Sequence, residues 1–322
     1  MSTMTAMPVA MPDHLDILAA AARIAPHARV TPVLRSSSLD ELAGAQLHFK
    51  CENFQRAGAF KFRGACNAVW SLSDEHAARG VVTHSSGNHG AALALAAKTR
   101  GIPAHVVVPE GAVKAKVAAI ESAGGQLHFC AATMAAREAL CAKLQAELGA
   151  NLVHPYLDPR VIAGQGTAAL ELLQQPGGLD LMLAPVGGGG LIAGTAIAVA
   201  AVSPGLRVLA AEPEGAADAH ESLRRGERVT DIVPDTLADG LRATIGAVNL
   251  AVLQAQGIDV LLVSDDETRA AMRLLWERLK ILVEPSSATV LAAVLRHPRH
   301  FSGRRVGLIL TGGNVDLDAR LW

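Results

Sequence analysis

Four consecutive glycines at positions 187–190 join an apolar segment to a helical one, and this junction restricts the possible fold more than any other feature of the chain. Residues 180–186 (DLMLAPV) predict a buried strand, and residues 191–202 predict a helix. A buried strand that runs directly into a helix is typical of an α/β protein. Because glycine lets the backbone approach a ligand, and the first N–H groups of a helix attract anions, the junction predicts a phosphate-binding loop.

The glycines alone leave open which phosphate compound the loop binds. Gly188, Gly190 and Ala193 match the pattern G-x-G-x-x-G/A of dinucleotide-binding proteins. Glu212 follows at about the spacing of an acid that binds a ribose. One alternative at this point is therefore an NAD-dependent dehydrogenase.

Strand and helix patterns alternate along most of the chain. The expected strands include residues 46–51, 81–83, 104–109, 126–130, 152–154, 207–212 and 306–310, and the expected helices include residues 91–99, 113–123 and 134–148. Such alternation predicts mostly parallel sheets with helices on both faces. Because 322 residues exceed what one core usually supports, we expect two domains. Residues 1–71 and 157–322 would form the larger domain, and residues 72–156 a smaller inserted one.

Composition and charge restrict the kind of partner. The net charge is -1 and aromatic residues make up 3% of the chain, so neither a basic field nor stacking platforms are available for nucleic acid. No apolar run is long enough to span a membrane, and the N-terminal residues lack the segments of a secretory signal. The four cysteines show no metal-ligand spacing. We therefore expect a cytoplasmic protein that acts on a small molecule.

A lysine with apolar neighbours occurs in residues 50–69 (KCENFQRAGAFKFRGACNAV). Lys61 lies between Phe60 and Phe62. Desolvation lowers the pKa of an amine and produces a nucleophile that can attack a carbonyl. Such a lysine holds pyridoxal phosphate as a Schiff base. The alternative is a lysine that begins an amphipathic helix and extends its amine into water.

Two polar loops follow predicted strands. Residues 83–90 (THSSGNHG) combine hydroxyls, an amide and an imidazole with two glycines, and residues 311–314 (TGGN) follow the last strand. Ligands bind at the carboxyl ends of strands in open parallel sheets. The first loop suits a carboxylate and a phenolate oxygen, although a helix cap by Ser85 or Ser86 explains part of it.

With these residues assembled, the chain resembles the fold type II pyridoxal phosphate enzymes, the tryptophan synthase β-like group. Within that group it resembles the branch of serine racemases, serine/threonine dehydratases and 3-hydroxyaspartate dehydratases. The resemblance rests on the ordered motifs KCENFQRAGAFKFRGA, THSSGNHG, HPYLDPRVIAGQGT, PVGGGGLIAG, AAEP, LADGL, VEPSSA and TGGNVDL. It implies two open, twisted, mostly parallel sheets covered by helices, and it gives Lys61 a role that the dinucleotide alternative lacks.

The resemblance implies roles for residues at matching positions. Lys61 is expected to carry the cofactor and to act as the catalytic base at the substrate Cα. The residues expected to bind the cofactor are Phe60, Lys61, Asn88, Gly187, Gly188, Gly189, Gly190 and Thr311. Those expected to bind the substrate carboxylate are Ser85, Gly87, Asn88 and His89. Thr311 presents a neutral hydroxyl to the pyridine nitrogen, which favours loss of a β-hydroxyl over transamination.

Ser86 and Arg137 bear on the reaction type and on the substrate. Ser86 matches the serine racemase pattern, where a serine is the second catalytic acid/base; the alternative is a loop cap. Arg137, with Tyr156 and Arg160, is expected to supply a cation for a second carboxylate, as in a 3-hydroxyaspartate dehydratase. The alternative for both arginines is a solvated surface position. Ala59 departs from the family pattern G-S-F-K by removing a hydroxyl beside the lysine.

Glu212 and Asp218, with the carbonyl oxygen of Ala216, match the family's divalent-cation site. Two carboxylates, a carbonyl and waters suit Mg²⁺, or Ca²⁺ or Mn²⁺, because hard cations take oxygen ligands. For Asp218 alone, the alternative is an exposed acid after a strand. Glu284 and Asp239 match acids at the rim of the cofactor site, where we expect a structural role.

The expected function is that of a pyridoxal phosphate-dependent ammonia-lyase. It removes water from serine, threonine or 3-hydroxyaspartate and yields a 2-oxo acid and ammonia. The alternatives are a serine or aspartate racemase that uses Lys61 and Ser86, and a catalytically silent pyridoxal phosphate-binding protein. The resemblance implies a homodimer. The extent of the chain after Asn314 predicts no C-terminal regulatory domain, and therefore no control by isoleucine.

Overall fold

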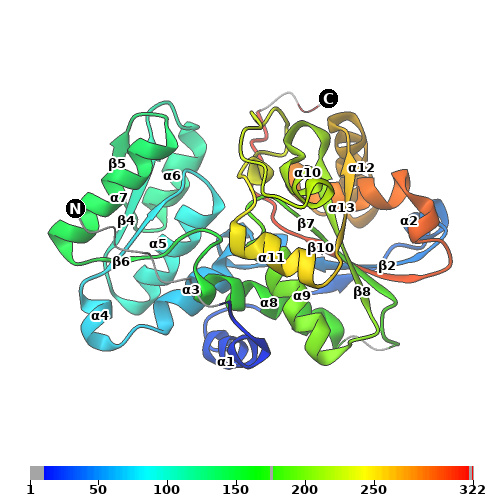
Figure 1. Cartoon of the computed structure of the whole chain (residues 1–322), viewed down its shortest axis with the longest axis horizontal. Helices are drawn as coiled ribbons and strands as arrows, with labels where there is room; N and C mark the ends of the chain where they lie inside the picture. Colours follow the sequence, from blue (N-terminus) through cyan, green and yellow to red (C-terminus); the bar gives the residue numbers. More distant parts are fainter. Residues whose placement is uncertain (1–10, 175–176, 319–320, 322) are drawn as a thin grey trace.

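The computed structural model describes residues 11–174, 177–318 and 321. Within these residues the chain forms a six-stranded and a four-stranded sheet, each covered by helices on both faces (Figure 1). All neighbouring strands are parallel apart from one pair at an edge. The prediction of an α/β fold with two mostly parallel sheets is therefore confirmed.

The larger sheet has the strand order β1-β2-β10-β7-β8-β9. Its strands are β1 (Val33–Leu34), β2 (Gln46–Cys51), β10 (Arg305–Leu310), β7 (Leu181–Pro185), β8 (Arg207–Pro213) and β9 (Asp259–Val263). β1 is antiparallel to β2 at the edge. β7 is buried along its whole length, because helices cover both faces of a central parallel strand.

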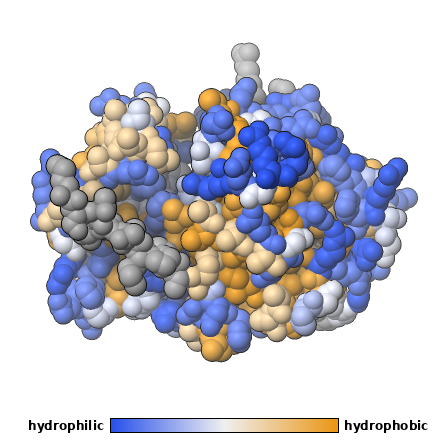
Figure 2. All heavy atoms as spheres, in the orientation of Figure 1, coloured by the Kyte–Doolittle hydropathy of each residue, from blue (hydrophilic) through white to orange (hydrophobic). Residues whose placement is uncertain are grey.

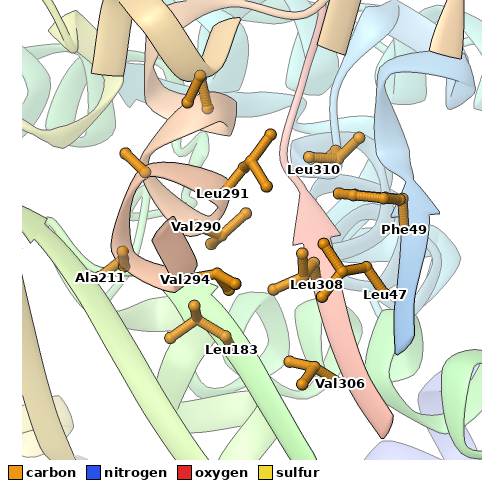
Figure 3. Close-up of a cluster of buried hydrophobic side chains, with 14 of the residues drawn as sticks. Leu47, Phe49, Leu183, Ala211, Val290, Leu291, Val294, Val306, Leu308 and Leu310 are labelled. Carbon is orange, nitrogen blue, oxygen red and sulfur yellow. The ribbon is translucent and has the colours of Figure 1, made fainter. Parts of the chain in front are cut away.

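Two hydrophobic cores lie on opposite faces of this sheet. One face is covered by α2 (Ser37–Ala43), α12 (Asp265–Leu279) and α13 (Pro285–Arg296), and the other by α1 (His14–Ile24), α8 (Pro159–Leu173), α9 (Gly190–Val202) and α11 (Ala247–Ala255). Figure 3 shows the first core, in which Leu47 and Leu308 of the sheet lie in one cluster with Val294 of α13. The two cores hold the carboxyl ends of β7 and β10 in place.

The smaller sheet has the strand order β5-β4-β3-β6 and is entirely parallel. Its strands are β5 (Gln126–Cys130), β4 (Ala104–Pro109), β3 (Val81–His84) and β6 (Asn151–Leu152). Helices α3 (Lys61–Trp70), α5 (Asn88–Arg100) and α6 (Lys114–Ser122) cover one face, and α7 (Met134–Leu148) covers the other. The remaining helices are α4 (Asp74–Ala78) and α10 (Asp218–Arg225). All four strands lie inside residues 72–156, and these proposed domain boundaries stay a prediction.

Two helices begin earlier than the sequence pattern indicates. α5 begins at Asn88, so Asn88 and His89 belong to its first turn and not to the preceding loop. α9 begins at Gly190, so the last glycine of the tetraglycine segment is helical. Both helices therefore direct their first N–H groups toward the strand ends from which the chain arrives.

A buried cluster of charges holds α3 against the larger sheet. Arg63 of α3 binds Glu52 at 2.7 Å and Glu171 of α8 at 2.7 Å, and Lys50 of β2 binds Glu171 at 2.5 Å. Both members of the Arg63–Glu52 pair are fully buried. Buried pairs of this kind tolerate little displacement, because breaking one leaves an uncompensated charge. The cluster thus fixes the helix whose first residue is Lys61.

In the described part of the chain, no helix is both long enough and apolar enough to cross a membrane. On the face shown in Figure 2, apolar residues gather over α11 and α9, and hydrophilic residues cover α10. The charges on α10 include Glu221, Arg224 and Arg225, which pair with one another at the surface.

Candidate active site

A cavity of about 730 Å³ lies where the carboxyl ends of strands from both sheets meet. His84 ends β3, Pro185 ends β7 and Thr311 follows β10, and all three line it. With the exception of Arg160, the residues predicted to bind cofactor or substrate also line it: Phe60, Lys61, Ser85, Ser86, Gly87, Asn88, His89, Arg137, Tyr156, Gly187, Gly188, Gly189, Gly190 and Thr311. The structure therefore brings these residues together, and their individual roles remain proposals.

Lys61 is the first residue of α3 and faces the cavity. Its Nζ donates a hydrogen bond to the carbonyl oxygen of Pro155 at 3.0 Å and lies 5.1 Å from the centre of the Phe60 ring. Burial lowers the pKa of Lys61 to about 8, although the nearby Glu284 carboxylate acts in the opposite direction. About a tenth of the amine is therefore neutral at pH 7 and about half at pH 8, compared with a negligible fraction for an ordinary lysine.

The tetraglycine segment forms a cradle between β7 and α9. The N–H groups of residues 187–190 donate no hydrogen bond to any other described residue. Gly189 has a φ of 90°, and a Cβ on Gly188 would lie 2.4 Å from Cγ of Tyr156, so neither position accepts a side chain without a shift. Free N–H groups at the positive end of a helix fit a phosphate group.

Two polar groups face the remaining part of the cavity. Asn88 Nδ2 donates to both carboxylate oxygens of Glu284 at 3.0 Å, and Thr311 Oγ1 lies 2.9 Å from Ser287 Oγ. Thr311 is buried and presents a hydroxyl, not a carboxylate. With the cradle and Lys61, these groups match the phosphate, aldehyde, phenolate and ring nitrogen of pyridoxal phosphate, so the residues present fit that cofactor.

The imidazoles beside the cavity are neutral. His89 Nε2 lies 3.2 Å from the carbonyl oxygen of Val153; since a carbonyl accepts, this nitrogen carries the proton. His89 Nδ1 is buried and has no partner among the described residues. Burial holds the pKa of His89 well below its usual range, and burial, His84 and Lys61 lower the pKa of His154 to about 3. These rings add no positive charge next to Lys61.

The two arginines considered for a second carboxylate differ in position. Arg137 of α7 lines the cavity, and its buried Nε has no hydrogen-bond partner in the described chain. Arg160 instead binds Asp158 at 2.6 Å and the carbonyl oxygen of Leu152 at 3.2 Å, and it is not among the cavity-lining residues. The geometry therefore favours Arg137 over Arg160 for a second carboxylate, because Asp158, which caps the same helix, already neutralises Arg160. Tyr156 lines the cavity.

The predicted metal ligands lie outside the cavity, at the end of β8 and the start of α10. Glu212 accepts hydrogen bonds from the N–H groups of Ala219 and His220, and Asp218 accepts one from Ile245. Burial raises the pKa of Glu212 to about 8 and that of Asp218 to about 6. Asp218 is buried, which contradicts the alternative of an exposed acid.

The chemistry of these ligands suits a hard cation. Within the described residues, no group of three or more His, Cys, Asp or Glu side chains could hold a metal. The proposed set consists of the Glu212 and Asp218 side chains and the carbonyl of Ala216. Without a metal, burial favours the protonated form of Glu212 near neutral pH, while the charge of Arg228 acts against the raised pKa of Asp218. Oxygen ligands of this kind would suit Mg²⁺, and the metal itself remains a proposal.

The sequence patterns did not indicate several residues around Lys61. Lys116 of α6 lines the cavity and forms an ion pair with Asp239, which lies in the segment between α10 and α11. Asn314 binds the Asn88 side chain, and Pro155 accepts the hydrogen bond of Lys61. Pro155, Asp239 and Asn314 lie in motifs that carry the family resemblance, but only their side-chain and backbone contacts in the structure show these interactions, and Lys116 lies outside every such motif.

Known proteins resemble this chain over nearly its whole length. The family model described as pyridoxal-phosphate dependent enzyme matches residues 24–312. A β-hydroxyaspartate dehydratase from Paracoccus denitrificans is 50% identical over 312 residues, covering 97% of this chain and 99% of that protein. A serine racemase from Arabidopsis thaliana is 50% identical over 315 residues, covering 96% and 95%. The structure of maize serine racemase matches with a TM-score of 0.93 at 46% identity, covering 96% and 95%.

The chain therefore belongs to the pyridoxal phosphate-dependent enzymes. Within fold type II of that class, it lies in the branch of serine racemases, hydroxyaspartate dehydratases and threonine deaminases. Membership in this family excludes the alternative, drawn from the glycine pattern, that the chain is an NAD-dependent dehydrogenase. Relatives that are 50% identical include a dehydratase and a racemase, so similarity alone does not separate these two reactions.

Proposed function

We propose that this chain is a pyridoxal phosphate-dependent dehydratase of 3-hydroxyaspartate. Loss of water across Cα and Cβ, followed by hydrolysis of the resulting imine, gives a 2-oxo dicarboxylic acid and ammonia. The observation that carries the proposal is Arg137, whose Nε lacks a partner in the cavity that also holds Lys61. The relative named β-hydroxyaspartate dehydratase supports it.

Lys61 supplies the base. When bound, pyridoxal phosphate withdraws electrons and makes the Cα proton of an attached amino acid acidic. The Lys61 amine, whose pKa is lowered to about 8 by burial, accepts that proton near neutral pH. The carbonyl of Pro155 accepts a hydrogen bond from Nζ and so orients the amine.

Other residues hold and orient the ligands. The N–H groups of residues 187–190 would hold the phosphate, Asn88 the phenolate oxygen and Thr311 the ring nitrogen. Because Thr311 presents a neutral hydroxyl and not a carboxylate, it would leave that nitrogen largely unprotonated, which would favour prompt departure of a β-hydroxyl. Ser85 and the first N–H groups of α5 would receive the α-carboxylate of the substrate.

Arg137 is expected to bind the second carboxylate of the substrate. An arginine and a carboxylate form paired, charge-assisted hydrogen bonds, and Arg137 forms no ion pair with a described residue that would compete. Serine and threonine have no group for this interaction. The arrangement therefore favours a dicarboxylic substrate over both.

A panel of serine, threonine and 3-hydroxyaspartate, scored for ammonia, 2-oxo acid and inverted enantiomer, tests the proposal. Wild-type protein is expected to be yellow, to keep label on Lys61 after borohydride, and to release ammonia fastest from 3-hydroxyaspartate. Arg137→Met is expected to raise KM for 3-hydroxyaspartate roughly tenfold to a hundredfold and to change serine kinetics little. Arg207→Met, at an exposed ion pair with Asp259, serves as the control.

Equal losses with serine and 3-hydroxyaspartate in Arg137→Met would contradict the assignment of the substrate. A yellow protein that releases ammonia from none of the three amino acids would instead be a silent cofactor-binding protein.

A racemase activity is the second candidate. The Ser86 side chain lines the cavity and forms no hydrogen bond with another described residue, so its hydroxyl is free to exchange a proton. The serine racemase from Arabidopsis thaliana supports this candidate. Inversion at Cα needs a proton donor on each face, whereas elimination needs a base on one.

Ser86→Ala is therefore expected to abolish inversion of serine or aspartate and to leave ammonia release within a few-fold of wild type. Chiral chromatography and an ammonia assay on the same reactions measure both. Parallel loss of the two activities would refute a separate role for Ser86.

A further inference from the structure

Asn314 connects two segments on either side of the cavity. Its Nδ2 donates to the carbonyl oxygen of Ala57 at 2.8 Å and to Oδ1 of Asn88 at 2.9 Å. Ala57 lies in the turn that precedes Lys61, and Asn88 is the first residue of α5. Asn314 itself follows β10. One side chain thus joins the lysine segment, the helix that carries Asn88 and the end of the central strand.

The turn before Lys61 is shaped around Asn314. Ala57 has a φ of 57°, which a residue with a side chain rarely adopts, and Gly58 follows with a φ of 69°. A Cβ on Gly58 would lie 2.3 Å from Oδ1 of Asn314, so Gly58 makes room for the asparagine. Gly313 N–H also donates to the carbonyl oxygen of Gly58 at 2.9 Å. The backbone therefore adopts an uncommon conformation against this one side chain.

The hydrogen bonds around Asn88 have a defined direction. Asn314 Nδ2 can only donate, so it requires the oxygen of Asn88 to point toward it. The Asn88 amide nitrogen must then point the other way, toward the two oxygens of Glu284 and the cavity. A reversed amide would place nitrogen against nitrogen at Asn314.

Glu284 alone does not ensure this direction. Burial raises the pKa of Glu284, while Asn88 and the Lys116 and Lys61 ammonium groups lower it. A protonated Glu284 can donate to an amide oxygen as readily as an ionised one accepts from an amide nitrogen. The bond from Asn314 has the same direction in either state, because an amide nitrogen does not accept.

We infer that Asn314 is a positioning residue that sets the direction of the Asn88 amide, so that its nitrogen is presented to the phenolate oxygen of the cofactor. This inference rests on the proposed function, because it assigns Asn88 to cofactor binding. Asn314 is exposed at the rim, so substitutions there leave the hydrophobic cores unchanged.

Titration of apoprotein with pyridoxal phosphate, followed by absorbance and fluorescence, tests the inference. Asn314→Asp replaces the donor by an acceptor of the same shape and favours the reversed Asn88 amide. We expect its dissociation constant for pyridoxal phosphate to rise roughly tenfold, the loss of about one charge-assisted hydrogen bond. Asn314→Ala, which leaves Asn88 free to rotate, is expected to give a smaller increase.

A double-mutant comparison isolates the route through Asn88. In an Asn88→Ala background, Asn314→Asp is expected to change the dissociation constant less than twofold, because the amide that Asn314 orients is gone. The matched control is Asn151→Asp. Asn151 Nδ2 likewise donates two hydrogen bonds, in this case to the backbone carbonyls of His76 and Gly80, at the smaller sheet and outside the cavity lining.

The outcomes separate the inference from the proposed function. If wild-type protein binds no pyridoxal phosphate, the proposed function itself is refuted. Wild-type binding with an unchanged constant in Asn314→Asp, or an equal tenfold effect in the Asn88→Ala background, would overturn the role of Asn314 alone. An equal loss in Asn151→Asp would show a general destabilisation and would also overturn it.

Discussion

Lys61 has the surroundings that an amine needs to be reactive. It forms no ion pair within the described residues, and its hydrogen bond goes to the neutral carbonyl of Pro155. The adjacent His89 and His154 are uncharged. Burial therefore dominates, and the pKa of Lys61 falls from its ordinary value of 10.5 to about 8 despite the attraction of Glu284. The flanking phenylalanines indicate this in the sequence, but the neutral imidazoles become visible only in the structure.

This shifted pKa predicts how the stability of the apoprotein depends on pH. Between about pH 8 and 10.5 the unfolded chain binds more protons at Lys61 than the folded chain, so stability rises with pH in that window. Below pH 8 the folded state carries a buried charge. Lys61→Met is therefore expected to stabilise apoprotein by about 3 kcal/mol below pH 8, and the gain should vanish above pH 10.5.

Denaturant unfolding of both apoproteins from pH 7 to 11 measures this effect. Lys143→Met, at a mostly exposed lysine of α7, is the control and should change stability little at any pH. A gain in Lys61→Met that stays constant to pH 11 would argue against a depressed pKa.

The β7–glycine–α9 unit shows how much a local pattern can determine. A buried strand, four glycines and a helix follow in that order in the structure, as the sequence predicts. The packing partner of the loop could not be predicted, because Tyr156 comes from a different part of the chain. Its ring lies where a Cβ of Gly188 would be, so glycine is required there by contact as well as by the needs of a phosphate.

Gly188→Ala is expected to weaken cofactor binding at least tenfold and to lower stability by about 1 to 3 kcal/mol. The new methyl group would lie 2.4 Å from the Tyr156 ring and force the loop or the ring to move. Absorbance titration with pyridoxal phosphate and thermal unfolding measure the two effects. Gly205→Ala has open space around its Cβ and should behave as wild type. Unaltered binding in Gly188→Ala would contradict a rigid phosphate cradle.

The segment from β8 to α10 carries the proposed cation site. Since burial raises the pKa of Glu212 to about 8 and of Asp218 to about 6, both carboxyls take up protons as the pH falls toward 6 in the absence of metal. Mg²⁺ must displace these protons. Its stabilising effect is therefore expected to grow from pH 6 to pH 8.

Thermal unfolding after chelation, with and without added Mg²⁺, tests this at both pH values. Glu212→Gln should lose the response to Mg²⁺, whereas Glu214→Gln, at an exposed acid paired with Arg296, should keep it. A melting temperature that does not change on addition of Mg²⁺ at pH 8 would contradict the proposed cation site.

At the scale of the whole molecule, the cavity exists because two sheets direct their strand ends to the same place (Figure 1). The Lys116–Asp239 ion pair joins α6, beside the smaller sheet, to a segment beside the larger one. The hydrogen bond from Asn88 to Glu284 makes a second connection across 196 positions of sequence. The homodimer and the cytoplasmic location stay predictions.

The sequence by itself determined the fold class, the glycine segment between a strand and a helix, and many of the residues that line the cavity. These follow from local patterns, because hydrophobic periodicity and glycine spacing are properties of short segments. Only the tertiary structure decided that Arg137 and not Arg160 lines the cavity, that His89 Nε2 donates to a backbone carbonyl, and that Asn314 donates to the Asn88 side chain. Burial and hydrogen-bond direction depend on which distant segments of the chain pack together, and this packing cannot be read from any one short segment.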